Sequence, residues 1–228
     1  MISNDEAKQL GLELTEKHKA TVLGIAKQCI KLPSGGFHIT STKAKAVRSN
    51  GIEVSLTCCR GDLCEMKNGF YPLVPPLSSA EEWTTTSKRI TMIHQDVCSP
   101  NITWLITDPA AAVLLVVCGA ITYGAWIGTD EIAVLLQQAP RLDQGIETIF
   151  GSVTNFGHAV YASFWFAFLA HLFEAGVAML YCRTLNLRTS SMVLWMFMVF
   201  LVGFPVLKEL QALVKAQEPS AESRSKKS

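Results

Sequence analysis

The second half of the chain contains three long apolar stretches without a charged residue. These charge-free windows lie between Asp108 and Asp130, between Glu147 and Glu174, and between Arg188 and Lys208. Each window is close to the roughly 20 residues that cross about 30 Å of hydrocarbon. The pattern predicts three transmembrane helices separated by short connections: 103–128, a connecting loop at 129–148, then 149–182 with its entry segment, and 190–207.

The first hundred residues show a different pattern, in which polar and apolar positions alternate with shorter periods. Residues 4–31 carry apolar side chains at mostly helical spacing, and Pro33-Ser34-Gly35-Gly36 follows them. Residues 37–48, 51–57 and 63–70 are rich in Thr, Ile and Val or alternate apolar with polar, as half-buried strands do. Ser49-Asn50-Gly51 is a hairpin turn signal between the first two strands and is typical of a type I′ turn, whose two central residues need a positive φ. A last helix is expected at about 79–98.

These elements predict an α+β head followed by an all-α membrane domain. The head covers residues 1–100 and contains a helix, three antiparallel strands and a second helix. The low hydrophobicity of residues 216–228 predicts a disordered tail.

Composition narrows the class of protein and its compartment. The chain of 228 residues is 49% hydrophobic with a formal net charge of +1, which gives no support for a nucleic-acid partner. The polar N-terminus lacks the apolar segment of a secretory signal, so we expect the first membrane helix to direct insertion into the endoplasmic reticulum. With a cytosolic head, the Arg183–Arg188 loop is also cytosolic and the acidic 129–148 loop lies outside, as the positive-inside rule favours, although the basic tail is then on the far side of the membrane. The seven cysteines match no metal-binding spacing and are expected to be reduced.

His171 and Glu174 are the candidate functional residues of the membrane half. They are three positions apart, so on a helix their side chains share a face and can meet. Acids within a membrane are unfavourable by a few kcal/mol, face the protein interior and are enriched at functional sites. A proton relay, a polar ligand contact and an interhelical hydrogen bond that only fixes packing all remain open. A metal centre is not expected, because helical-bundle metal sites combine several such pairs.

Two family resemblances cover most of the chain. The segments ELTEKHKATVLGIA (13–26), SNGIEVSL (49–56) and LVPPLSSAEE (73–82) resemble the small α+β domain of haem-utilisation and glutamyl-tRNA-reductase-binding proteins. The segments HLFEAGVAMLYC (171–182) and VLWMFMVFLVGFPVL (193–207) resemble the transmembrane protein 254 family. The first resemblance implies a link to haem or another tetrapyrrole and places His18 at that family's helical histidine. The second implies an integral membrane protein and supplies no activity.

The residues themselves place His18 on a polar stretch between two lysines, which is typical of a solvated surface. No nucleophile elbow, zinc spacing or dinucleotide fingerprint occurs, so no catalytic residue is assigned. We therefore expect a non-enzymatic, multi-pass membrane protein whose cytosolic head binds a protein or a small molecule. The alternatives are a haem-linked protein and a lipid or sterol enzyme or carrier that uses His171 and Glu174.

Overall fold

The computed structural model describes residues 2–32, 37–79, 82–83 and 87–217 of the chain. The protein divides into two compact units. The head unit contains Met1–Ser99, Arg183–Ser191 and Leu210–Ser228, and the helical unit contains Pro100–Cys182 and Met192–Glu209. The head unit is therefore built from three separate pieces of the chain.

The head begins with two helices, α1 (Asn4–Lys17) and α2 (Lys19–Cys29), where the sequence pattern predicted one. Ser3 caps α1 in a capping box with Glu6, which satisfies backbone N–H groups of the first turn. The helix is interrupted at His18, whose backbone is non-helical, with φ −130° and ψ 49°. The interruption gives the two helices different neighbours: α1 packs mainly on strand β1 (His38–Arg48), while α2 packs on helix α4 (Ser87–Val97) as well as on the sheet.

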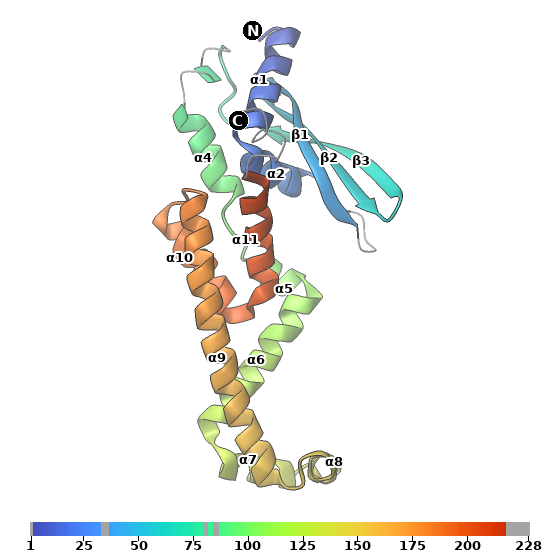
Figure 1. Cartoon of the computed structure of the whole chain (residues 1–228), viewed down its shortest axis with the longest axis vertical. Helices are drawn as coiled ribbons and strands as arrows, with labels where there is room; N and C mark the ends of the chain where they lie inside the picture. Colours follow the sequence, from blue (N-terminus) through green and yellow to red (C-terminus); the bar gives the residue numbers. More distant parts are fainter. Residues whose placement is uncertain (1, 33–36, 80–81, 84–86, 218–228) are drawn as a thin grey trace, which may run out of the picture. The chain divides into compact units, whose positions relative to one another are not determined.

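The predicted antiparallel sheet is confirmed, with strands β1 (His38–Arg48), β2 (Gly51–Arg60) and β3 (Leu63–Pro72) in the order β1-β2-β3. Figure 1 shows α1 and α2 beside this sheet. The central strand is the most buried and supplies Ile52, Val54 and Leu56 to the head core. The β-branched alternation that predicted these strands therefore marks the core of the head.

The first hairpin turn differs from the predicted type I′ turn. Arg48 pairs with Gly51, so Ser49 and Asn50 form the loop, and neither has a positive φ. Gly51 instead opens β2, where a Cβ atom would collide with the ring of Phe70 on β3. The glycine thus serves close packing of neighbouring strands.

Helix α4 (Ser87–Val97) completes the predicted head, while residues 80–81 and 84–86, on which its predicted start falls, lie outside the described residues. Cys59 and Cys64, which face each other across β2 and β3, form a disulfide. The expectation that all cysteines are reduced is wrong for this pair. The other five cysteines, Cys29, Cys58, Cys98, Cys118 and Cys182, are not disulfide-bonded.

The helical unit starts with a short helix α5 (Trp104–Thr107) and a long apolar helix α6 (Pro109–Ile127). Asp108 separates them because its carboxylate accepts a hydrogen bond from the Ala111 amide at 2.9 Å and caps α6. The predicted span 103–128 is therefore two helices. The predicted loop 129–148 is also helical and comprises α7 (Thr129–Gln137) and α8 (Pro140–Phe150).

The second predicted span corresponds to α9 (Val153–Thr184), a single helix of 32 residues. The third predicted span, 190–207, is interrupted. Helix α10 (Thr189–Val202) ends at Gly203, and α11 (Phe204–Gln217) begins directly after it (Figure 1). Gly203 has a φ of +77°, a left-handed conformation that turns the chain and that other residues rarely adopt. A stretch without charged residues predicts an apolar environment, but it does not predict that the stretch forms one continuous helix.

Two of the described helices, α6 and α9, are long and apolar enough to cross a membrane. Only 11% of the residues in either apolar window are buried within the protein. The exposed side chains are large and apolar, for example Val116, Trp126, Phe166 and Phe173. The apolar core helix of a soluble protein is mostly buried, whereas these two helices are exposed. Their apolar surface is therefore suited to contact with lipid.

Candidate functional sites

The predicted pair on α9 meets the break between α10 and α11. His171 and Glu174 lie on the same face of α9, as their spacing predicted. A Cβ atom built on Gly203 would lie 2.9 Å from both His171 Nε2 and Glu174 Oε2. Both side chains therefore point at the backbone of Gly203, and a glycine is needed for them to approach so closely.

The His171 ring completes a hydrogen bond that the helix break leaves open. In a continuous helix the carbonyl of residue 200 would accept from the amide of residue 204. Here α10 ends before that bond, and His171 Nδ1 donates to the Phe200 carbonyl at 2.7 Å. In the neutral ring, Nε2 then carries the lone pair and faces Gly203. His171 thus acts as a side-chain cap for the end of α10.

Glu174 has no equivalent explanation. Its Oε2 is buried and has no hydrogen-bond partner, and it is the one buried side-chain N or O atom in this situation among the described residues. Buried polar atoms are almost always paired, and an exception calls for a missing partner such as water, an ion or a ligand. No cluster of three potential metal-binding side chains occurs in the described part of the chain, so this pair lacks the further ligands of a metal centre.

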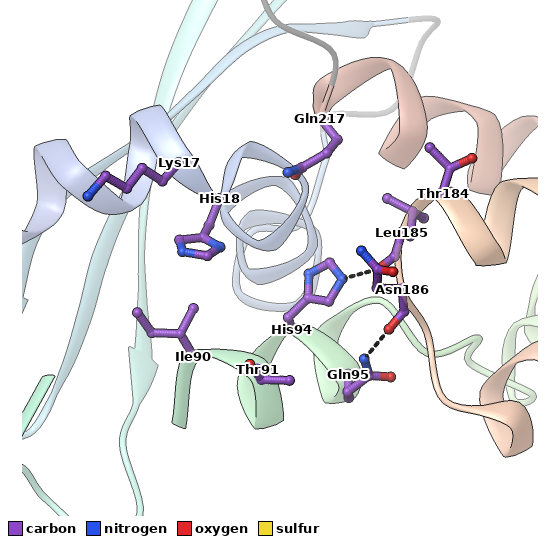
Figure 2. Close-up of a pocket in the computed structure, with 10 residues that line it drawn as sticks. All are labelled: Lys17, His18, Ile90, Thr91, His94, Gln95, Thr184, Leu185, Asn186 and Gln217. Atoms are coloured by element: carbon purple, nitrogen blue, oxygen red, sulfur yellow. Dashed lines mark hydrogen bonds between the residues drawn. The ribbon is translucent and has the colours of Figure 1, made fainter. Parts of the chain in front are cut away.

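A second candidate site lies wholly within the head unit. An open cavity of about 240 Å³ is lined by the junction of α1 and α2, by α4, by residues 184–186 and by the end of α11. Figure 2 shows the side chains of His18, His94 and Gln217, which come from the junction of α1 and α2, from α4 and from α11, among the residues that line it. His18 was expected on a solvated surface, but the helix break makes it half-buried and places it in the cavity wall.

Burial determines the chemistry of His18. Partial removal from water, and secondly the charge of His94, lower the pKa of His18 below the usual value. The ring is therefore largely neutral near pH 7, with one N–H donor and one acceptor nitrogen.

His94 was not assigned a role by the sequence, yet it connects three parts of the head. Its Nε2 donates to the Leu185 carbonyl at 2.8 Å, and its Nδ1 lies 2.9 Å from the Thr21 hydroxyl. Because a carbonyl only accepts, the Nε2–H tautomer is required, and Nδ1 of the neutral ring then accepts from Thr21. These partners are 91 and 73 residues away in sequence, so no local signal predicted them.

The neighbouring Gln95 makes a similar connection. Its side-chain amide donates to the Asn186 carbonyl, its side-chain oxygen accepts from the Arg188 amide, and both distances are 2.7 Å. Asn186 has a positive φ of 51°, which asparagine tolerates better than most residues. The buried side-chain amide of Gln95 on α4 thus holds the turn between α9 and α10 within the head unit.

Comparison with known proteins identifies the region that contains the first site. Residues 112–213 match the family model for transmembrane protein 254, which confirms the resemblance of the second half. The match includes His171, Glu174 and Gly203, and it excludes most of the head. No curated protein and no solved structure matches the chain. The resemblance of the head to haem-utilisation proteins stays a prediction. Taken with the two exposed apolar helices, the family match indicates a membrane protein.

Proposed function

We propose that this protein is a two-span integral membrane protein whose cytosolic head binds a small molecule or a protein partner and has no enzymatic activity. The observation that carries this proposal is the exposed apolar surface of α6 and α9: only 11% of the apolar window of each helix is buried within the protein. Insertion at the endoplasmic reticulum remains the expectation for such a chain.

The third apolar segment is proposed to enter the membrane and return on the same side. Helix α10 has 14 residues, which at 1.5 Å each extend about 21 Å, less than the roughly 30 Å of hydrocarbon. After Gly203, α11 leads the chain back into the head unit, where the Gln217 side chain accepts from the Ala20 amide at 3.2 Å. A re-entrant hairpin therefore accounts for the turn, the short helix and the contact of the C-terminal helix with the head.

Charge distribution supports this topology and a cytosolic head. With a hairpin, the basic loop at Arg183 and Arg188 and the basic tail lie on the side of the head. The opposite connection, 129–148, carries four acidic residues and one arginine. A third span would instead place the basic tail with this acidic connection, against the positive-inside rule.

The topology can be tested with a glycosylation acceptor placed in turn at the N-terminus, in the 129–148 connection and at the C-terminus. We expect glycosylation only in the 129–148 connection, and resistance of the protein to extraction by alkaline carbonate. Glycosylation at one terminus but not the other would contradict the hairpin. Release of the protein by carbonate would contradict membrane integration.

A lipid or sterol carrier is a second candidate, which the unpaired Glu174 oxygen favours. A sterol or lipid hydroxyl could donate to this oxygen from within the bilayer. Replacement of Glu174 by Gln and of His171 by Ala should then abolish retention of a photoactivatable sterol or lipid on the purified protein. Unchanged retention in both variants would remove the support for this function.

A tetrapyrrole link rests on the resemblance of the head alone. The cavity at His18 is smaller than the roughly 300–1,000 Å³ typical of sites for larger cofactors and drug-sized ligands. It therefore favours a smaller ligand. Addition of haem to the purified protein, followed by absorption spectroscopy, tests the link: a Soret shift that is lost in His18→Ala would support it.

A further inference from the structure

The wall of the head cavity contains hydrogen-bond donors and no acidic residue. Its ten lining residues include one lysine, two histidines, three side-chain amides and two threonines, and none is Asp or Glu. Buried acids would repel an anion, whereas N–H and O–H groups bind one. The composition of the wall therefore favours a negatively charged ligand.

Two of these side chains have donors to offer. Among the described residues, the His18 ring makes no hydrogen bond, whereas His94 and Gln95 are hydrogen-bonded to the protein through both of their polar side-chain atoms. The Gln217 oxygen accepts from the Ala20 amide, so its NH₂ group retains donors. The two side chains come from different elements, His18 from the junction of α1 and α2 and Gln217 from the end of α11 (Figure 2). A ligand between them would be held from two sides.

The start of α2 adds a favourable field. This 11-residue helix begins at Lys19, directly after His18, and its first turn contains no acidic residue. The N-cap residue His18 makes no side-chain capping bond, and the Ala20 amide of the first turn donates to the Gln217 side chain. The positive end of a helix dipole stabilises an anion nearby. This effect acts in the same direction as the donors of the wall.

We propose that the head cavity binds a small oxyanion, a phosphate or carboxylate group, between His18 and Gln217. Lys17 can contribute charge from the rim, where it now pairs with Glu13 at 2.6 Å in an exposed contact of small energetic value. The volume of about 240 Å³ suits a ligand of a few heavy atoms. This inference rests on the proposed binding function of the head and names the chemical class of its ligand.

The site also joins the head to the ends of α9 and α11, because residues 184–186 and Gln217 form part of its wall. An oxyanion bound there would contact the beginning of α2 and the last turn of α11 at once. The ligand should therefore strengthen the attachment of the C-terminal helix to the rest of the head unit.

The test is equilibrium dialysis of full-length protein in phosphatidylcholine nanodiscs against radiolabelled inorganic phosphate, and separately against labelled acetate, at constant ionic strength. We expect saturable uptake of one of these anions with one site per chain, weakened at least tenfold in His18→Ala and in Gln217→Ala. His38→Ala is the matched control, because His38 is exposed and lies outside the cavity. Its uptake should equal that of the unaltered protein.

Three outcomes decide the proposal. Absence of saturable uptake of either anion, or equal uptake in all variants, overturns it, while the carbonate and glycosylation results leave the membrane function standing. In nanodiscs that contain phosphatidic acid, loss of phosphate uptake by the unaltered protein would identify a lipid headgroup as the occupant. Unchanged uptake in those nanodiscs would identify a soluble anion. Circular dichroism of each variant verifies that the head is folded.

Discussion

Substitution of Gly203 by alanine tests whether the break between α10 and α11 requires a glycine at this position. The residue has a φ of +77°, a conformation that costs an L-residue roughly 1–2 kcal/mol. The new Cβ would also lie 2.9 Å from His171 Nε2 and Glu174 Oε2, closer than such atoms approach. Overpacking of this kind costs about 1–3 kcal/mol. The two terms together predict a loss of about 2–5 kcal/mol in the free energy of unfolding.

Titration of the protein in mixed micelles with a denaturing detergent, followed by far-UV circular dichroism, measures this change. Gly176→Ala is the matched control, since Gly176 lies in the middle of α9 and an added Cβ meets nothing within 4 Å. Alanine is favoured over glycine in a helix interior by about 1 kcal/mol, so this control should be neutral or more stable. Equal stabilities of the two variants would refute the proposed role of Gly203.

A double-mutant cycle identifies the clashing partner. Glu174→Ala removes the carboxyl group that the new Cβ would meet, and it should reduce the cost of Gly203→Ala. We expect a coupling free energy of about 1 kcal/mol, within the range measured for contacting residues. Strict additivity of the two changes would show that backbone strain alone accounts for the loss.

Three further predictions concern the head. His94→Phe should lower the free energy of unfolding, measured by urea titration, by about 2–3 kcal/mol, because it removes two hydrogen bonds and leaves the Leu185 carbonyl without its donor. The control variant His38→Phe should have little effect in the same titration. The lowered pKa of His18 means that the unfolded chain binds its proton more readily, so the unfolding temperature should fall as the pH decreases through about 6.5 and level off below the folded-state pKa. His18→Gln should flatten that profile, and an unchanged profile would refute the assignment. The Cys59–Cys64 disulfide opposes the proposed cytosolic head, because disulfides persist in oxidising compartments and are rare in the cytosol. A cytosolic head therefore requires this pair to be reduced in cells, so rapid alkylation in intact cells should modify both thiols without prior reduction. Protection of both thiols would refute the cytosolic orientation.

The strands of the head could be predicted because each carries its own signal. Alternation of side chains and two short turns define β1 to β3 without reference to distant residues. The break at His18 could not be predicted in this way, since the polar run around it is compatible with a continuous exposed helix. What interrupts the helix is packing, because α1 and α2 have different neighbours in the head. Local pattern thus predicted the elements, and tertiary packing decided where one helix became two.

The third apolar window illustrates a different limit. A stretch without charges satisfies the requirements of a span and of a shorter helix followed by a turn. Gly203 and Pro205 were the local indications of a break, but glycine and proline also occur within transmembrane helices. The deciding information is that Leu210 to Gln217 belongs to the head unit, which only the three-dimensional structure supplies.

The pair His171 and Glu174 on α9 was predicted from spacing alone. The structure explains the presence of His171 but not that of Glu174. His171 caps the Phe200 carbonyl, so its presence is accounted for by the break that Gly203 creates. Glu174 is not required by that cap, and its Oε2 remains buried without a partner among the described residues. A purely structural role would be served equally well by an apolar side chain, which would avoid the cost of an unpaired polar atom. The search for function within the membrane should therefore concentrate on Glu174, with His171 as the residue that positions the helix break beside it.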